Sequence, residues 1–271
     1  MLEKLFRRDK LDSKDWHDRM TAMLETVQTH SPRAVEAVVK GMQDGDHQVR
    51  AMAARAASGW PSDHEPLRDP RVAAALASIL RDPDPETRTA AARSLAQVGL
   101  HGALPDLLHA WPEALAAHEQ HPYDVFYEGL AEALGASGDE AAVTPLVELL
   151  MRGGPRERQI ARGALRDLGQ LTTNAVIELL HNPDPAIRIE AVEHLGAIRA
   201  AETCALLVAM LGDPAADDWL GFPRSVRDAA KSALVAIGPP ALPALQRAVA
   251  EGGKTRRLAA EALSEIRAAT A

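Results

Sequence analysis

One pattern, Arg-x-x-Ala-x-x-x-Leu, recurs along this chain and constrains its fold more than any other feature. Full copies begin at Arg88, Arg158, Arg188, Arg227 and Arg256, a shortened copy begins at Arg50, and Tyr127 takes the arginine position in the remaining copy. Successive copies begin 38, 39, 31, 30, 39 and 29 residues apart. A repeat at this spacing indicates a solenoid of stacked supersecondary units.

The pattern places small and large apolar residues on one face of a helix. Alanine and leucine follow the first position by three and seven residues, and an apolar residue such as Val49 or Ile187 precedes it. Further amphipathic stretches precede most copies, at 72–81, 141–151, 174–181, 204–211 and 241–250. Because two helices cannot bury their apolar faces alone, the units must stack. We therefore expect an all-α fold, an α-solenoid of about seven helix pairs.

Turn and capping residues mark the ends of the expected helices. Asp84 and Asp184 precede Pro at the first helical position and can cap the second helices. Gly99, Gly169 and Gly238 are expected to end second helices. An amphipathic stretch at 14–29 is expected to cap the first unit. The predicted domains are an N-terminal segment with this capping helix, residues 1–30, and one continuous solenoid, residues 31–271.

The turns and the repeated pattern together resemble the bacterial HEAT-repeat proteins, with HEAT-like repeats of the phycobilin-lyase type, over about residues 32–268. The resemblance implies a hydrogen-bonded ladder between stacked units, built from each repeat arginine and an Asp six residues before it. The residues assigned to the ladder are Asp44, Arg50, Asp82, Arg88, Arg188, Arg227 and Arg256. Asn182 and Arg152 replace this Asp, so we expect a weaker ladder around the fourth and fifth units.

Composition limits the partners and the compartment. The net charge of −8 disfavours nucleic acid as a partner, because neutralising phosphates requires a basic surface. Cys204 is the single cysteine, so no intramolecular disulfide can form, which is typical of a reducing compartment. Neither a signal peptide nor an apolar stretch of membrane-spanning length is evident. We expect a cytoplasmic protein that makes no membrane contact.

Two insertions, at 118–123 and 213–223, account for the two 39-residue intervals, and each lies between the helices of its unit. Most of the aromatic residues lie in or beside them, and the partner-binding candidates are Trp111, Tyr123, Phe126, Trp219 and Phe222. Aromatic side chains on loops are common anchors of binding surfaces. The alternative is that these rings fill gaps where the repeat is irregular, and Tyr127 is the first candidate for that role.

A second candidate surface is a strip of arginines, Arg158, Arg162 and Arg166, on one side of a second helix. The resemblance places second helices on the concave surface, where this strip could bind an acidic peptide or a phosphate. The alternative is a solvated face paired with Glu148, Glu157 and Asp167.

The sequence contains no catalytic constellation. The run His118-Glu119-Gln120-His121 lacks the spacing that brings two imidazoles together on a helix. The His-Glu pairs of deoxyhypusine hydroxylase, a HEAT-like di-iron enzyme, do not carry over, because His64-Glu65 and His118-Glu119 are expected in loops. We therefore expect no enzyme activity, no metal and no cofactor.

The predicted function is a non-catalytic scaffold or adaptor that binds a protein partner. The identity of that partner and the oligomeric state stay open. Two alternatives are a nucleic-acid-binding or DNA-repair HEAT-like protein, and a phycobilin-lyase-type subunit or chaperone.

Overall fold

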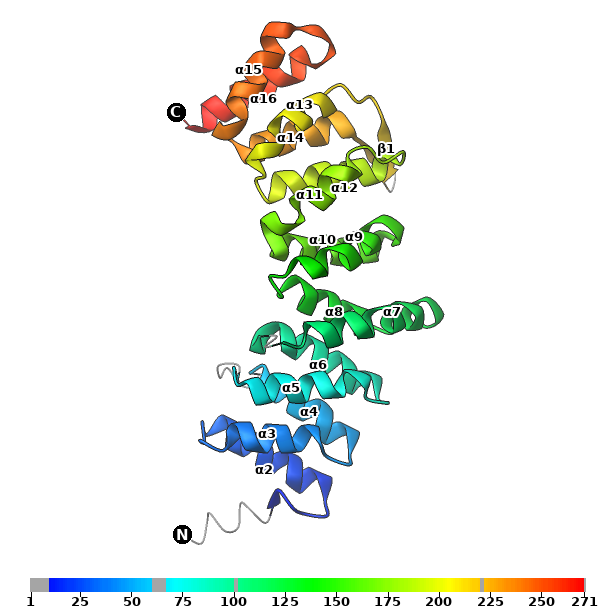
Figure 1. The fold of residues 1–271 in the computed structure, drawn as a ribbon, viewed down its shortest axis with the longest axis vertical. Coiled ribbons are helices and arrows are strands. Elements are labelled where there is room, and N and C mark those ends of the chain that lie inside the picture. The colour runs from blue at the N-terminus through cyan, green and yellow to red at the C-terminus, as the bar shows by residue number, and fades with distance from the viewer. Residues whose placement is uncertain (1–9, 60–66, 100–101, 220–221, 271) are drawn as a thin grey trace. The chain divides into compact units, whose positions relative to one another are not determined.

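The computed structural model describes residues 10–59, 67–99, 102–219 and 222–270, with the backbone alone for residues 217–219 and 222–223. It confirms the expected fold class, an all-α solenoid of HEAT-like helix pairs, with one short β-hairpin added (Figure 1). The chain divides into two compact units, residues 1–145 and 146–271. Each unit is described by itself.

Unit 1 contains the capping helix and the first three helix pairs. Its helices are α2 (Trp16–Gln28), α3 (Ala34–Met42), α4 (His47–Ala57), α5 (Pro70–Ser78), α6 (Pro85–Val98), α7 (Leu104–Gln120) and α8 (Phe126–Gly135). Single 3-10 turns are η1 (Ile79–Arg81) and η2 (Glu140–Ala142), and α9 (Val143–Arg152) crosses the boundary between the units. The helix α2 packs against α3 and α4, as expected for a cap.

Unit 2 repeats the same plan. Its helices are α10 (Pro155–Leu168), α11 (Thr173–Leu179), α12 (Pro185–Ala197), α13 (Cys204–Met210), α14 (Val226–Ile237), α15 (Leu242–Glu251) and α16 (Arg256–Thr270). The 3-10 turns are η3 (Gly169–Thr172), η4 (Ala201–Thr203), η5 (Pro239–Ala241) and η6 (Gly253–Thr255). The second helices α12, α14 and α16 pack in sequence order.

The alanine seam is buried as the repeat predicts. The alanines at the fourth position of the pattern, Ala53, Ala91, Ala161, Ala191, Ala230 and Ala259, are all fully buried. Small residues allow very close approach of neighbouring second helices. A Cβ added to Gly196 of α12 would lie 2.6 Å from the Cα of Ala233 of α14. The close packing of the second helices therefore depends on residues without bulk at the crossing points.

The expected helix ends are also confirmed. The carboxylate of Asp84 accepts a hydrogen bond from the backbone N–H of Thr87 (2.7 Å), and that of Asp184 accepts one from Ala186 (2.9 Å). Gly99, Gly169 and Gly238 follow α6, α10 and α14 with φ of 97°, 58° and 80°. These positive values place each glycine where a side chain would be strained, so each can end its helix at low cost.

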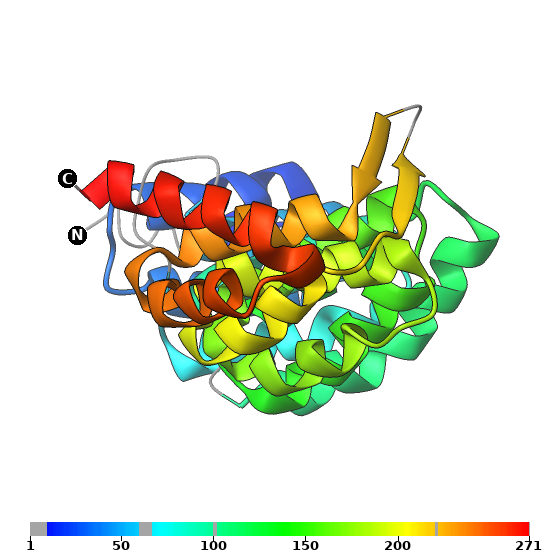
Figure 2. The same ribbon diagram turned by 90° about the horizontal axis from the view of Figure 1, so that it is seen from above.

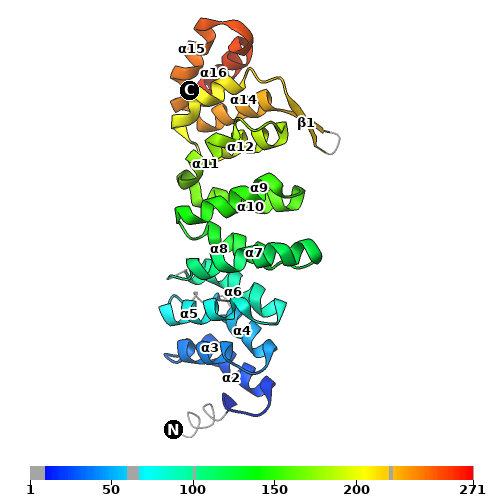
Figure 3. The same cartoon turned by 45° about the vertical axis from the view of Figure 1, so that its right-hand side comes forward.

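The two insertions have more regular structure than the sequence indicates. The first extends α7 to Gln120, so the expectation of His118 and Glu119 in a loop is wrong, whereas His64 and Glu65 lie outside the described residues. The second forms an antiparallel hairpin of β1 (Ala216–Trp219) and β2 (Phe222–Ser225), with Trp219 opposite Phe222. The hairpin projects beside α12 and α14 in two views (Figures 2 and 3). The helical repeat carries no information on backbone pairing within an insertion, so the sequence did not predict the two strands.

Candidate functional site

Within each compact unit, arginine–aspartate pairs join successive helix-pair repeats along one edge of the second helices. Arg50 donates from Nε (2.6 Å) and Nη2 to the carboxylate of Asp82 in the next repeat. Arg19 of the capping helix binds Asp44 in the same bidentate way, with both bonds at 2.7 Å. In unit 2, Arg188 Nε donates to Asp213 (2.8 Å). The planar guanidinium fits a carboxylate well, so these pairs fix both spacing and register.

The six-residue spacing has a second function within each unit. Nη1 of Arg50 donates to the carbonyl of Asp44 (2.9 Å), and Nη1 of Arg188 donates to the carbonyl of Asn182 (2.7 Å). Each arginine therefore contacts its own turn through Nη1 and the aspartate of the next repeat through Nε. Asn182 can replace Asp in the contact within the turn, because the acceptor there is a backbone carbonyl, which every residue has.

The other repeat arginines follow this pattern less regularly. Arg88 Nη1 donates to the carbonyl of Asp82 (2.9 Å), and Arg88 Nη2 lies 3.7 Å from Asp124, just after the first insertion. Arg158, which was not assigned to the ladder, donates from Nε to the carbonyl of Gly153 (3.0 Å). Among the described residues, Arg227 and Arg256 have no carboxylate within ion-pair distance. The ladder is therefore most regular at the start of unit 1.

The ion pairs lower the pKa values of their carboxyl groups. The Arg19 guanidinium beside Asp44 holds the pKa of that carboxyl below its usual value. Burial alone would raise the pKa of Asp82, but the hydrogen bonds from Arg50 and from the backbone N–H of Asp84 outweigh it, so the pKa is lowered. These carboxylates are ionised and structural at neutral pH.

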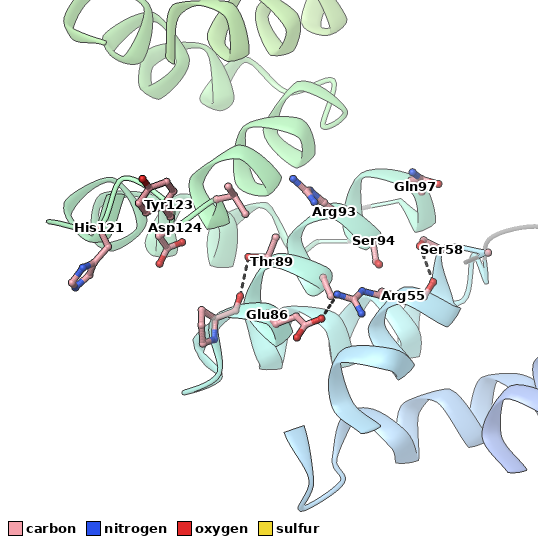
Figure 4. Close-up of a pocket in the computed structure, with 14 residues that line it drawn as sticks. Arg55, Ser58, Glu86, Thr89, Arg93, Ser94, Gln97, His121, Tyr123 and Asp124 are labelled. Atoms are coloured by element: carbon pink, nitrogen blue, oxygen red, sulfur yellow. Dashed lines mark hydrogen bonds and ion pairs between the residues drawn. The ribbon is translucent and has the colours of Figure 1, made fainter. Parts of the chain in front are cut away.

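A groove opens in unit 1 on the face formed by the second helices. Its volume is about 1090 Å³, and α4, α6 and the loop after α7 line it (Figure 4). The groove residues include Arg55, Glu86, Arg93, Gln97 and Tyr123. This volume is at the upper end of ligand-sized cavities, so the groove has room for a polypeptide segment. We call it the unit 1 groove.

The hydroxyl groups of the unit 1 groove already donate to the protein itself. Ser58, Thr89 and Ser94 donate to the carbonyls of Arg55, Pro85 and Ala54 at 2.7–2.8 Å. Among the longer side chains, Arg55 and Glu86 pair with each other, whereas Arg93, Gln97 and Tyr123 are exposed on the groove. Figure 4 shows Arg93 and Gln97 together on α6, with Tyr123 on the loop at the far side of the groove.

Only one of the predicted aromatic contacts in unit 1 is exposed. Tyr123 is 95% exposed, whereas Trp111 and Phe126 are buried in α7 and α8. The guanidinium of Arg88 lies 5.4 Å from the ring centroid of Phe126, and the ring of Tyr127 lies 4.2 Å from that of His118. Trp111, Phe126 and Tyr127 thus fill the irregular part of the repeat, and Tyr123 is the exposed ring among the candidates whose side chains the structure describes. The side chains of Trp219 and Phe222 lie outside the described residues.

A second groove has a corresponding position in unit 2. It has a volume of about 460 Å³ and is lined by α12, α14 and the end of β2. Glu193 of α12, Arg224 of β2 and Asp228 of α14 form its charged part, and the rest consists of glycine, alanine and serine. In each unit, the insertion that precedes a second helix therefore borders a groove on the second-helix face. We call this one the unit 2 groove.

One arginine of the predicted strip, Arg162, is paired with the next second helix. Arg162 Nε lies 3.1 Å from Glu190 and Arg162 Nη1 lies 3.8 Å from Glu193, both of α12. Arg166 is exposed. Burial raises the pKa of Glu190, and the charges of Arg162 and Arg224 oppose that rise. The carboxylates of α12, and not those suggested by the sequence, are the partners of Arg162.

Similar pairs recur between neighbouring second helices. Arg55 binds Glu86 of the next repeat, Arg93 lies 3.5 Å from Glu128, and Lys231 donates to Glu265 (3.0 Å). Sequence reasoning missed this set because it sought partners within one helix. The available signal was a cation four or five residues after the start of one repeat, with an acid five residues after the start of the next. Glu132, Glu193 and Glu261 lie at that position and pair with Arg93, Arg162 and Lys231.

A buried histidine lies beside the acidic pair on α12. His194 is 3% exposed, and its Nε2 lies 2.7 Å from the hydroxyl oxygen of Thr172. Burial, aided by the charge of Arg166, lowers the pKa of His194 to about 4. His194 is therefore neutral at pH 7 and functions as a hydrogen-bonding core residue.

The described residues contain no group of three or more side chains arranged to hold a metal ion. Cys204 is buried, and burial raises the pKa of its thiol. Within the same described ranges, no single helix has both the length and the apolar character to cross a membrane.

Comparison with known families agrees with this architecture. The family model of HEAT repeats matches residues 63–116, 156–221 and 173–264, and that of the PBS lyase HEAT-like repeat matches residues 127–150. Since the first of these covers more than half of the sequence, the chain belongs to the HEAT-repeat family. No curated protein matches the sequence significantly.

The chain is similar to several solved structures over most of its length. The complex of CpcE and CpcF of phycocyanin lyase from a Nostoc species contains a chain that is 21% identical, with a TM-score of 0.51, 96% coverage of this chain and 93% of that one. Human deoxyhypusine hydroxylase is 20% identical, with a TM-score of 0.36 and coverages of 98% and 99%. The Escherichia coli protein YibA is 18% identical, with a TM-score of 0.46 and coverages of 98% and 92%. At 21% identity, the likeness to the chain of the CpcE–CpcF complex concerns the fold alone.

Proposed function

We propose that this protein is a non-catalytic scaffold or adaptor whose second-helix grooves bind a protein partner. The observation that carries the proposal is the pairing of an insertion with a groove in each unit. The loop after α7 borders the unit 1 groove, and the end of β2 borders the unit 2 groove. Repeat proteins commonly use such continuous helical faces, with variable loops beside them, for recognition.

Tyr123 is the proposed anchor in unit 1. An exposed tyrosine offers a large contact area and a hydroxyl group at small entropic cost, and such residues often dominate binding energy. Arg93 and Gln97 add hydrogen-bond donors across the groove. The hairpin supplies Trp219 and Phe222, the candidate anchors that the sequence placed in the second insertion.

The test starts from partners captured on the full chain from its native host and identified by mass spectrometry. The affinity of a purified partner is then measured for Tyr123→Ala and for the double variant Trp219→Ala with Phe222→Ala. Loss of one anchor should weaken binding at least about tenfold, equivalent to roughly 1.4 kcal/mol. Leu171→Ala is the matched control, because Leu171 is also exposed and apolar but lines neither groove. If both anchor variants bind as tightly as the control, the proposal fails.

A second candidate function is that of a subunit or chaperone of phycobilin-lyase type. Its support is the match of residues 127–150 to the PBS lyase HEAT-like repeat and the likeness in fold to a chain of the CpcE–CpcF complex. Such a protein would bind a tetrapyrrole or a chain that carries one. Visible absorbance of the protein purified from cells that make phycobilins tests this directly, and a colourless product that transfers no bilin would contradict it.

A further inference from the structure

We propose that Glu190 and Glu193 of α12 are positioning residues that hold the β1–β2 hairpin at the unit 2 groove through Arg224. The role of the hairpin in partner binding rests on the proposed function. The positioning of the hairpin by Glu190 and Glu193 does not depend on any partner.

Arg224 of β2 is the charged link between the hairpin and α12. Its Nη2 donates to Glu193, and its Nη1 lies 3.7 Å from Glu190. Arg162 of α10 contacts the same two carboxylates from the other side. Two carboxylates of one helix thus lie between two guanidiniums, one from a neighbouring helix and one from the hairpin.

The burial of Glu190 distinguishes this cluster from ordinary surface ion pairs. The Glu190 side chain is 2% exposed, and that of Arg224 is 26% exposed. An exposed pair contributes little, but removing a cation from a buried carboxylate leaves a charge that water cannot solvate. Arg162 Nε already lies 3.1 Å from Glu190, and Arg224 adds a second cation beside this poorly hydrated carboxylate, which ties the position of β2 to α12.

The other end of the insertion is fastened to the same helix. Asp213, just before the hairpin, accepts a hydrogen bond from Arg188 of α12 (2.8 Å) and one from the backbone N–H of Ala215 (2.9 Å). The backbone N–H of Val226 then donates to the carbonyl of Ala215 (3.0 Å), which closes the base. Both ends of the hairpin are thus held by α12 residues within two turns of each other.

The hairpin requires such external contacts. Each strand has four residues, and among the described residues the two strands pair only with each other. An isolated two-stranded hairpin is at best marginally stable in water. Without the α12 carboxylates, the strands would separate from the helices and the segment that carries Trp219 and Phe222 would lose its fixed place beside the groove.

Hydrogen–deuterium exchange of the full chain, followed by mass spectrometry, tests the assignment without a partner. Arg224→Ala should accelerate exchange in residues 215–226 about tenfold, while the rest of α14 and α16 stay unchanged. Glu193→Gln should have a similar effect, and the double variant should exchange little faster than either single variant, because both remove the same contact. Arg224→Lys, which keeps the charge, should restore most of the protection.

Lys231→Ala is the matched control, because Lys231 joins α14 to α16 by comparable ion pairs but does not touch the hairpin. It should leave exchange in residues 215–226 unaltered. The inference is overturned if Arg224→Ala stays within twofold of the unmodified protein, or if the effects of Arg224→Ala and Glu193→Gln simply multiply. Loss of partner binding with normal hairpin exchange would concern the proposed function and would leave this assignment intact.

Discussion

Arg50 and Asp82 are separated by 32 residues in sequence, yet they form a bidentate ion pair in which both side chains are largely buried, with exposures of 14% and 6%. The same two residues each contact their own turn, through the carbonyl of Asp44 and the backbone N–H of Asp84. One pair thus stabilises two turns and the contact between two successive repeats. The contrast with exposed pairs on the same helices leads to the first prediction.

Asp82→Ala should destabilise the protein by about 3 kcal/mol, because it leaves the guanidinium of Arg50 without its carboxylate in a poorly hydrated site. Glu86→Ala removes the partner of Arg55 from a carboxylate that is 57% exposed and should cost less than about 1 kcal/mol. Urea unfolding followed by circular dichroism measures both. Equal costs for the two variants would contradict the structural role assigned to Asp82.

The neutral state of His194 predicts a loss of stability on mild acidification. The pKa of His194 is about 4 in the folded protein and about 6.5 in an unfolded chain, so the unfolded chain binds the additional proton between these values. Stability should therefore fall as the pH is lowered from about 6.5 to about 4, by up to about 3 kcal/mol. His194→Gln should remove most of this slope. Parallel stability–pH curves for the two proteins would show that His194 is not the responsible group.

The ladder carboxylates predict a further loss at lower pH. Asp44, Asp82 and Asp213 have lowered pKa values in the folded protein, so their contribution is present above a pH of about 4 and is lost as the pH falls towards the folded values. Arg19→Ala should bring the pKa of Asp44 back towards its usual value and flatten this part of the profile. The pKa of Asp44, measured by NMR titration, is the direct readout, and an unchanged value would contradict the pairing.

Two glycines on second helices should respond to alanine in opposite directions. Gly196→Ala places a Cβ 2.6 Å from the backbone of Ala233, which cannot move easily, and should destabilise the protein by about 2 kcal/mol. A Cβ added to Gly163 of α10 would have open space around it, so Gly163→Ala should stabilise the helix by roughly 0.5–1 kcal/mol. Thermal unfolding distinguishes the two. Similar shifts of the melting temperature would refute the close contact.

The helical part of the fold follows from local patterns. The alanines of the repeat predict the seam, and Asp84, Asp184 and the glycines predict where helices begin and end, because each of these cues acts within a few residues. The family resemblance supplied the ladder, and Asp82 and Arg50 lie as it implied.

The candidate site was less accessible to sequence reasoning. The aromatic cluster of the first insertion gave no means to separate the buried Trp111 and Phe126 from the exposed Tyr123, since burial depends on how the extended α7 meets α8. The partners of Arg162 were missed because Glu190 and Glu193 are about 30 residues away in sequence. Contacts of that range become visible only once the repeats are laid over one another in register.

The arginine–aspartate ladder also bears on how such a chain can change in length. Each rung needs one arginine from a repeat and one acid from the repeat that follows, as in Arg19 with Asp44 and Arg50 with Asp82. Duplication or loss of one whole repeat therefore leaves every charge matched, whereas a cut through a repeat would leave a guanidinium or a carboxylate stranded at the junction. The ladder thereby favours growth and shortening of the chain in complete helix pairs.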